Sequence, residues 1–435
     1  MANIIGFIDF SGAHTIITLV VFLLTFTFIT TEKLPNAIAA SVGAFLLVAF
    51  HILSQEEAIG FIDFDTIGLL CGMMITVAVM RKSGLFEYIA IKGIKFAKGD
   101  PWKILVVLSI VTAVLSAFLD NVTTVLIIVP LTFAVAEAIK INPTPILISE
   151  VLFSNVGGAA TLIGDPPNIM IGGSTHLGFT DFIYNNTPVV IITCFVIFFL
   201  LRLIYYKKLK AVEIDTSKIM AFDEKRTIQN RKLFFTSLAV FAFIILAFIT
   251  QHIHMVSLAS VSLGGGFIMM MVTRQDPEET LKEVEWPTLF FFIGLFIIVG
   301  GLEKTGVIAA IADKMTEATN GDIEMATQAV LWISALCTTF INSIPYTATM
   351  ISVIHDMGIV IGGNIDPIWW ALSLGACFGG NGTIIGAAAN IIVAGFTQKT
   401  SHPITFKEYA KVGIPLMLVS IVIVSVYLHL VHFVF

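Results

Sequence analysis

The sequence predicts an all-α polytopic membrane protein with about ten transmembrane helices and two re-entrant hairpins, arranged as two inverted repeats with discontinuous helices. Three observations lead to this fold class. The chain of 435 residues is 57% hydrophobic and only 12% charged, whereas soluble domains carry roughly 25% charged residues. Several apolar runs reach the ~20 residues that span a bilayer. A stretch rich in glycine and proline interrupts one apolar run and recurs 222 residues later.

The interrupted stretch, residues 154–172, combines helix breakers with an acid. Proline removes a backbone N–H and clashes with the preceding turn, and glycine loosens a helix. Within a bilayer, broken backbone persists only where it is buried in protein or lines a wet cavity. An acid at that depth, here Asp165, marks a candidate functional site. We interpret the stretch as a discontinuous helix at a binding site. Its breakers are Gly157, Gly158, Gly164, Pro166 and Pro167.

The same stretch has a second copy in the chain. The letters GGAATLIG at 157–164 reappear as GGNGTIIG at 379–386, and Asn168 reappears as Asn390, so the offset is 390 − 168 = 222. One ungapped register also relates residues far from the breaks. These pairs are Gly72 with Gly294, Lys82 with Lys304, Gly84 with Gly306, Gly99-Asp100 with Gly321-Asp322, and Phe118 with Phe340. Because hairpin tips and helix breaks recur together, we infer an internal repeat.

The first repeat is predicted over residues 1–206. Apolar runs predict spans near 13–30, 36–53, 66–80 and 189–206, and a basic segment at 81–103 predicts an interfacial amphipathic helix. Residues 104–139 form two short apolar arms around Asp120-Asn121, which predicts a re-entrant hairpin with these residues at its tip. The broken helix is predicted at about 146–171.

A charged linker at 207–232 is predicted to separate the repeats, and the second repeat covers 233–435. It is predicted to contain a hairpin at about 325–354 with Asn342-Ser343 at its tip, and a broken helix at about 367–396. The remaining predicted segments are spans near 233–250, 256–272, 288–301 and 413–432 and an amphipathic stretch at 307–321.

Charge placement predicts the topology. If each hairpin counts as no crossing, each half crosses the membrane five times. If the basic segment at 81–103 then faces the cytoplasm, the linker at 207–232 also lies in the cytoplasm. Both termini then lie outside, and the two hairpins open toward opposite sides. Inverted repeats with helix breaks near the midplane are typical of secondary transporters. We therefore expect a multi-pass protein of the cell (inner) membrane whose first apolar run is a retained span.

The two hairpin tips and two helix breaks are expected to converge on one substrate-binding or ion-binding site. No Arg or Lys falls near the tips in the sequence, and both acids come from the first repeat. This composition favours a proton, a small cation, or a neutral hydroxylated solute exchanged for protons, with Asp120 and Asp165 as the proton-coupling residues. The candidate residues are Asp120, Asn121, Thr123, Thr124, Gly158, Thr161, Asp165, Asn168, Asn342, Ser343, Thr347, Asn381, Thr383 and Asn390.

Structural alternatives remain open for several of these residues. Asp165 could only cap a half-helix, and Asp120-Asn121 could only form a turn. Three asparagines could satisfy loose backbone groups without touching solute: Asn342, Asn381 and Asn390. Glu150, in the arm before the first break, is expected to be an interfacial or structural acid and not a proton relay. Cys337 and Cys377 lie near the second tip and second break, where thiols could bind trivalent arsenic, although small buried cysteines are usually core residues.

Other functional classes find little support in the sequence. No basic tract indicates nucleic-acid binding, and the four cysteines lack the paired spacing of a disulfide framework or metal site. We expect no cofactor and no metal. An intramembrane enzyme would need a nucleophile–base pair or metal ligands, and His-Glu-x-x-His and Gly-x-Ser-x-Gly are absent. A channel is a further alternative. No nucleotide-binding loop is present, so an ATPase partner would be a separate subunit.

Two segments resemble a known family. FLDNVTTVLIIVP at 118–130 and ISEVLFSNVGGAATLIGDPPNIMIG at 148–172 are similar to signature segments of the ion transporter (ArsB/NhaD) superfamily, in particular its ArsB and P-protein branch. The resemblance implies scaffold and transport domains that move by an elevator-type mechanism, and a homodimer. It implies arsenite or antimonite as solute for ArsB and sodium–proton exchange for NhaD.

More distant relatives in this superfamily carry carboxylates with sodium, using Ser-Asn-Thr motifs at the hairpin tips. Here the tips read Asp120-Asn121-Val122-Thr123 and Asn342-Ser343-Ile344-Pro345. We therefore expect a proton-coupled arsenite or antimonite efflux permease. The alternatives are a sodium–proton antiporter and, with less support, a sodium-coupled carboxylate transporter.

Overall fold

A computed structural model of the chain describes residues 12–31, 33–210, 224–228, 230–398, 400 and 402–434. Within these ranges the regular structure is entirely helical. Most of the charged linker predicted at 207–232 lies outside the described residues. Its described end forms a short helix, η1 (Glu224–Thr227), in which Glu224 pairs with Lys95 of the amphipathic helix α5 (Leu85–Phe96).

The described part of the first half of the chain contains ten helices. The predicted hairpin consists of α6 and α7, with residues 117–120 as its tip, and the predicted broken helix consists of α8 and α9, interrupted at residues 159–165. The helices are α1 (Ala13–Thr31), α2 (Asn36–Ala49), α3 (Gln55–Gly60), α4 (Phe64–Lys82), α5 (Leu85–Phe96), α6 (Pro101–Ser116), α7 (Asn121–Ala138), α8 (Thr144–Gly158), α9 (Pro166–Ser174) and α10 (Phe179–Lys210).

The second half repeats this order at the offset read from the sequence. Helix α4 begins at Phe64 and α16 at Trp286, a difference of 286 − 64 = 222. The helices are α12 (Arg231–Ile249), α13 (Gln251–His254), α14 (Leu258–Thr273), α15 (Pro277–Leu281), α16 (Trp286–Lys304), α17 (Val307–Ala318), α18 (Ile323–Phe340), α19 (Ser343–Ile361), α20 (Asp366–Gly379), η2 (Ile384–Gly386), α21 (Ala388–Thr397), α22 (Phe406–His429) and η3 (Leu430–Val434).

The two halves pack around an approximate two-fold relation. Helix α4 packs extensively on α14, and the equivalent pair, α16 on α2, packs in the same way. Likewise, α7 packs on α21 while α19 packs on α9, so each hairpin contacts the broken helix of the other half. These exchanged contacts define two layers: a scaffold of α2, α4, α14 and α16, and a core of the hairpins and broken helices.

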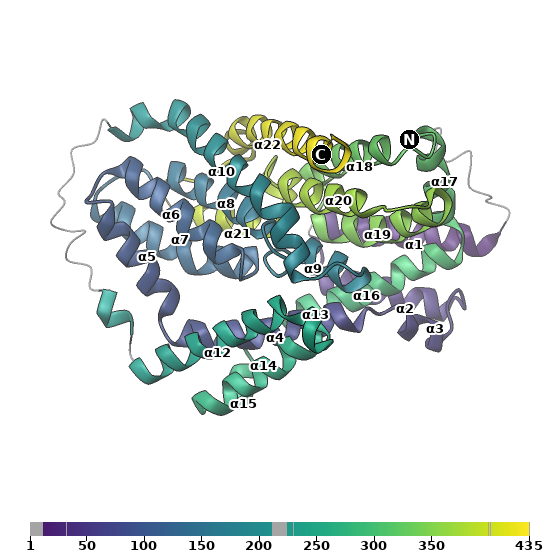
Figure 1. The fold of residues 1–435 in the computed structure, drawn as a ribbon, viewed down its shortest axis with the longest axis horizontal. Coiled ribbons are helices and arrows are strands. Elements are labelled where there is room, and N and C mark those ends of the chain that lie inside the picture. Colours follow the sequence, from purple (N-terminus) through teal and green to yellow (C-terminus); the bar gives the residue numbers. More distant parts are fainter. Residues whose placement is uncertain are drawn as a thin grey trace.

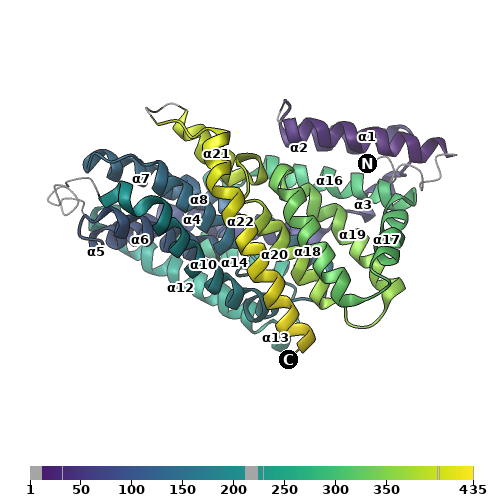
Figure 2. The same ribbon diagram turned by 90° about the horizontal axis from the view of Figure 1, so that it is seen from above.

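The hairpins enter this core from opposite ends of the molecule. In both views α5, α6 and α7 lie toward one end, whereas α17, α18 and α19 lie toward the other (Figures 1 and 2). The pair between Lys95 and Glu224 places η1 beside α5. The basic segment and the described end of the linker therefore share one end, as the charge pattern predicts. Opposite entry of the hairpins is the arrangement expected of inverted repeats.

Among the described residues, nine helices are long and apolar enough to cross a membrane: α1, α4, α7, α10, α12, α16, α18, α19 and α22. Four shorter apolar helices, α2, α6, α14 and α21, complete the set. Three hairpin arms are therefore as long as ordinary spans, although the tips end inside the molecule. The multi-pass all-α fold class is confirmed.

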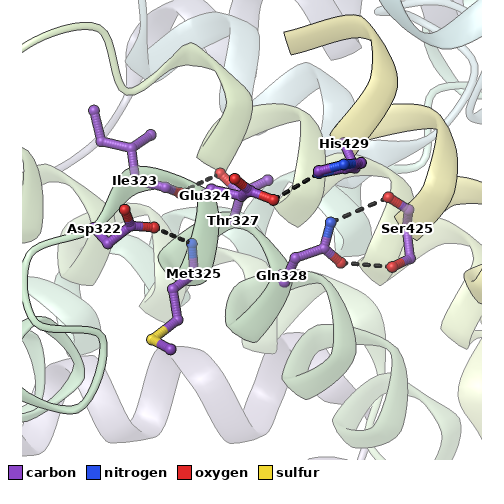
Figure 3. A network of polar contacts seen from close by, with 8 residues as sticks. All are labelled: Asp322, Ile323, Glu324, Met325, Thr327, Gln328, Ser425 and His429. Atoms are coloured by element: carbon purple, nitrogen blue, oxygen red, sulfur yellow. Dashed lines mark hydrogen bonds and ion pairs between the residues drawn. The ribbon is translucent and has the colours of Figure 1, made fainter. Parts of the chain in front are cut away.

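The base of each hairpin is fastened to the long helix that ends its own repeat. In the second repeat Glu324 of α18 lies 2.6 Å from His429 Nδ1 of α22, and the Gln328 amide exchanges two hydrogen bonds with Ser425 (Figure 3). In the first repeat an edge-to-face pair of rings, Trp102 and Tyr206, lies at the equivalent place with centroids 6.0 Å apart. The two repeats thus make this contact at the same place, through polar groups in the second repeat and aromatic rings in the first.

Candidate functional site

The two hairpin tips and the first residues of both second half-helices meet at one cavity of about 280 Å³ in the centre of the molecule. The scaffold closes its other wall with the beginnings of α2 and α16. Five sequence-predicted residues line the cavity: Asp120, Asn121, Asp165, Asn342 and Ser343. The expected convergence of tips and breaks is therefore present in the structure.

Asp120 is both a helix cap and a wall of the cavity. It occupies the N-cap position of α7, where its Oδ1 accepts the backbone N–H of Thr123 at 2.8 Å. Its backbone carbonyl accepts the hydroxyl of Thr124 at 3.0 Å. Thr123 instead faces a small adjoining cavity of about 40 Å³. Asp120 was considered as a residue that only forms a turn; it caps α7 and also belongs to the lining of the cavity.

Asp165 begins α9 but does not cap it. Its side chain makes no capping hydrogen bond, and its Oδ1 accepts from Asn121 Nδ2 at 3.2 Å. Only 3% of the residue is exposed. A buried carboxyl group that makes no capping hydrogen bond to its own helix can accept hydrogen bonds from other partners. The interpretation of Asp165 as only a cap is therefore wrong.

A chain of asparagine amides joins the two repeats beside the cavity. Asn155 accepts from Asn121 at 3.3 Å and donates to Asn381 at 2.9 Å and to Asn390 at 3.0 Å. Asn381 also donates to the carbonyl of Leu152 at 3.3 Å. Asn155 was not among the predicted residues, although it precedes the glycines of the first break. Because its repeat equivalent is Cys377, the repeat comparison gave no signal for it.

The breaks themselves are held by matched side-chain bonds. Asn168 Nδ2 donates to the carbonyl of Thr161 at 2.9 Å, and Asn390 Nδ2 donates to that of Thr383 at 2.8 Å. The Thr161 hydroxyl donates to the carbonyl of Ala117. The Thr383 hydroxyl donates to that of Thr339 at 2.5 Å.

These four residues lie outside the cavity lining. They satisfy the loose backbone groups of the breaks, as the structural alternative for Asn390 proposed. Gly158 belongs to the same arrangement, since a Cβ there would lie 2.7 Å from the carbonyl oxygen of Gly164.

Thr347, a candidate residue, and Glu150 both lie outside the cavity lining. Thr347 Oγ1 is buried without a hydrogen-bond partner. Glu150, fully buried on α8, accepts the Thr132 hydroxyl and has a second oxygen without a partner. Neither residue lines the central cavity. The expectation that Glu150 is structural stays a prediction.

The scaffold supplies polar residues that the sequence analysis missed. Glu285 and Thr288 line the cavity from the start of α16, with the Thr288 hydroxyl 3.0 Å from Glu285 Oε2, and Asn36 lines it from the start of α2. They were missed because they sit at the ends of ordinary spans, without a helix break to mark them.

The described lining thus contains three carboxylates and no Lys, Arg or His. One expectation needs correction here: Arg81 lies close to the site, in the small cavity that also contains Thr123 and Glu285, where it pairs with Glu283.

The thiols do not reach the cavity. Cys377 is buried in α20 with its Sγ 3.7 Å from Asn168 Oδ1, and Cys337 is half-buried in α18. Neither lines the site. Among the described residues no cluster of His, Cys, Asp or Glu has the arrangement of a metal site.

Comparison with known proteins places this fold and cavity in a family. Residues 26–375 match the model of the CitMHS family, described as citrate transporter. The chain belongs to this family. It is accordingly a multi-pass membrane transporter, within the wider superfamily that the sequence motifs indicated.

Relatives across nearly the whole chain are transporters or membrane proteins by name. An uncharacterized transporter of Mycobacterium tuberculosis is 38% identical, covering 97% of this chain and 99% of its own length. The 46 kDa membrane protein of Mycobacterium leprae is 37% identical, covering 96% and 98%. The human P protein is 32% identical over 94% of this chain and 59% of its own length.

Two solved transporters share the fold at low sequence identity. MtrF of Neisseria gonorrhoeae, described as belonging to a class of antimetabolite efflux pumps, has a TM-score of 0.62 and 12% identity, with 100% of this chain and 97% of that chain covered. The YdaH transporter of Alcanivorax borkumensis, described as having an unusual topology, has a TM-score of 0.58 and 12% identity, with 96% and 98% covered. At this identity the likeness concerns the fold alone.

Proposed function

We propose that the protein is a proton-coupled secondary active transporter that exports arsenite or antimonite through the central cavity. The observation that carries the proposal is the cavity lining, in which Asp120, Asp165 and Glu285 converge without a cationic side chain. In their neutral hydroxide forms, trivalent arsenic and antimony are small solutes with several O–H groups. Carboxylate, amide and hydroxyl groups are suitable acceptors and donors for such a solute.

Two acids that line one cavity support the proposal of proton coupling. Asp165 is buried, and Asp120 lines the same cavity from the hairpin tip. Two like charges in a low-dielectric site repel each other. A proton or small cation bound between the two carboxylates reduces this repulsion. A solute that donates hydrogen bonds to the carboxylates competes with the proton, which makes exchange of one for the other feasible.

Two alternatives rest on specific observations. A sodium–proton antiporter would use the same three carboxylates without any solute. A sodium-coupled carboxylate transporter is favoured by the family description, which names citrate. A carboxylate solute would be repelled by the acidic lining unless cations enter with it, because the described lining contains no cationic side chain. We therefore rank this alternative below arsenite export.

Transport to both sides would require the core to move against the scaffold, in the elevator manner. The exchanged packing of α4 on α14 and α16 on α2 supports a scaffold that stays intact while the hairpins and broken helices shift. We further propose a homodimer in the cell (inner) membrane, with the central linker in the cytoplasm and both termini outside. An ATPase, if one takes part, would be a separate subunit.

Transport by the purified protein in liposomes tests the proposal. Arsenite, sodium, citrate and chloride are each supplied with and without a pH gradient, and solute and proton fluxes are measured together. We expect arsenite flux that depends on the pH gradient and moves protons in the opposite direction. Proton flux that requires sodium alone would establish the antiporter instead. Citrate flux without arsenite flux would overturn the proposal.

A further inference from the structure

A second, apolar cavity lies behind the first helix break, between α6, α8 and α10. This groove has a volume of about 470 Å³. Its floor contains Phe153, Gly157 and Ala160, which are buried, and its rim contains Val114 and Phe195, which are 55% and 72% exposed. No charged residue belongs to its described lining. The groove is therefore a hydrophobic site that opens on the outer surface of the molecule.

The few polar groups of the groove are already satisfied. The hydroxyl of Thr161 donates to the carbonyl of Ala117. The hydroxyl of Thr187 donates to the carbonyl of Ala160 at 2.9 Å. A ligand in this groove would consequently gain dispersion contacts and would find no unused hydroxyl to bind. Such a site selects an apolar ligand by the absence of polar anchoring points.

The second repeat shows why the groove exists. At the offset of 222, Ile191 and Thr187 of α10 correspond to Gly413 and Tyr409 of α22. Gly413 lets α22 approach the second break so closely that a Cβ there would lie 2.4 Å from the carbonyl oxygen of Asn381. Tyr409 is only 2% exposed. In the first repeat the larger Ile191 lies beside the groove, which is therefore specific to this half and not required by the fold.

We infer that this groove binds an acyl chain of a membrane phospholipid. Helix α10 is among the helices long and apolar enough to span the bilayer, and only 28% of its most apolar 18-residue stretch is buried in the protein. The exposed apolar rim therefore faces lipid tails. An apolar hollow left without atoms forfeits the dispersion contacts of its whole lining. A lipid chain restores them without desolvating any polar group.

The position of the groove gives the bound chain a role. Gly157 lies in the last turn of α8, Ala160 and Thr161 lie in the first helix break, and Asp165 at the end of the same break lines the central cavity. The bound acyl chain thus supports the break on a side that does not line the proposed transport site. The inference concerns lipid binding itself and stands whichever solute the central cavity carries.

Photochemical labelling tests the inference on the full-length protein in liposomes. The bilayer contains a trace of phosphatidylcholine with a diazirine in one acyl chain, and adducts are mapped by mass spectrometry after illumination. We expect adducts on the buried floor, at Phe153 and Ala160, as well as on exposed residues of α10 such as Phe199. Labelling of Phe199 without labelling of the floor would overturn the inference.

Two variants make the test specific. Val114→Trp places an indole over the mouth of the groove and should remove most floor adducts while leaving those at Phe199. Phe199→Trp, a matched change on the lipid-facing surface outside the groove, should leave the floor adducts unchanged. Floor labelling that is insensitive to Val114→Trp contradicts a chain entering from the rim. Cross-links between two copies across this face, with no lipid adducts, would assign the groove to a protein interface instead.

Discussion

At the scale of single residues, Asp120 and Asp165 differ in the hydrogen bonds that they make at the starts of their helices. Asp120 caps α7 through one oxygen. Asp165 begins α9 without capping it and accepts a hydrogen bond from Asn121. The cap fixes Asp120 at the tip, whereas Asp165 is the carboxyl group whose contacts inside the site can change during transport. We therefore expect Asp165 to be the more sensitive position.

The first prediction follows from this difference. Asp165→Asn keeps the size of the side chain and removes its ability to carry a proton. Solute flux driven by a pH gradient should fall by about tenfold or more, which corresponds to a loss of about 1.4 kcal/mol or more. The measurement is flux in liposomes with and without the gradient. Asp100→Asn, which alters the N-cap of α6 outside the cavity lining, is the control, and equal losses in both variants would contradict the assignment.

The second prediction concerns Asn155, which bonds to asparagines of both repeats. Asn155→Ala leaves buried amide groups of Asn381 and Asn390 with fewer partners. A buried group without its hydrogen bond costs about 1–3 kcal/mol, so the midpoint of thermal unfolding in detergent should fall. Thr316→Ala, which removes a buried hydroxyl that has no hydrogen-bond partner, provides the comparison. A midpoint unchanged by Asn155→Ala would show that the amide chain does not join the repeats.

Sequence reasoning found the residues that a helix break or hairpin tip makes conspicuous. Asp120, Asp165 and Asn342 stand out because polar groups are costly in an apolar run, and all three line the cavity. It missed Glu285 and Asn155. Glu285 starts an uninterrupted span, and its contact with the core depends on how α16 packs, which one sequence does not disclose. Asn168 and Asn390 were placed in the site, but they bond to backbone groups of their own breaks.

At the scale of elements, each break depends on close packing of its half-helix on a hairpin arm. A Cβ at Gly157 would lie 2.4 Å from the carbonyl oxygen of Ala113 on α6. A Cβ at the equivalent Gly379 would lie 2.1 Å from Thr338 Oγ1 and 2.5 Å from the carbonyl oxygen of Ala335 on α18. Both repeats therefore use a glycine where two helices touch through their backbones.

The third prediction tests this packing. Gly157→Ala should lower the yield of folded protein or its unfolding midpoint, because overpacking a tight contact typically costs about 1–3 kcal/mol. Gly264→Ala, in α14, meets no atom within 4 Å. That variant should be neutral or stabilising by about 0.5–1 kcal/mol. Size-exclusion profiles and thermal unfolding provide the measurement, and a harmless Gly157→Ala would contradict the close approach.

Helix existence was predictable at this scale, and helix ends were less so. The hairpin arms were expected from residues 104 and 325, whereas α6 and α18 begin at Pro101 and Ile323, where Asp100 and Asp322 cap them. The amphipathic segment expected at 81–103 is a shorter helix, α5. Gly84 before it and Gly99 after it adopt positive φ angles of 74° and 82°, which end regular helix on both sides. Hydropathy locates the apolar run, and caps and glycines locate its ends.

At the scale of the whole molecule, the core departs from the two-fold relation with the scaffold. The central cavity lies where the scaffold residues Pro35–Ala37 and Pro287–Phe291 face the tips. The equivalent scaffold face carries Ser257–Ala259, together with Asp65 and Leu69, and contacts the end of α9 around a separate cavity of about 150 Å³. The core therefore sits closer to one of two equivalent scaffold faces.

Helix packing shows the same displacement. Helix α19 packs closely on α17, whereas its equivalent α7 contacts α5 much less. Helix α9 packs on α4, and its equivalent α21 has no comparable contact with α16. Because the repeats share one fold, exchanging their roles gives a second arrangement with the tips at Ser257–Ala259. The sequence predicted the two-fold relation but not the displacement, since two similar repeats do not indicate which of the two arrangements is adopted.

The fourth prediction concerns an introduced disulfide that should hold the core in the present arrangement. A Cβ at Gly173 would lie 2.4 Å from Thr66 Oγ1, so the pair Thr66→Cys and Gly173→Cys should form a disulfide across α4 and α9. In a background without the four native cysteines, oxidation should stop solute flux, and reduction should restore it. Full flux in the oxidised protein would show that the core does not need to leave this scaffold face.

The most direct measurement concerns the equivalent pair, Thr288→Cys and Gly395→Cys, related to the first by the offset of 222. A Cβ at Gly395 meets no atom within 4 Å here, so this pair is not in contact in the present arrangement. If the core moves between two equivalent scaffold faces, this pair will also form a disulfide under oxidation, detected by mass spectrometry, and will stop transport reversibly. Cross-linking at Thr66 and Gly173 without any at Thr288 and Gly395, in a protein that transports solute, would contradict the account.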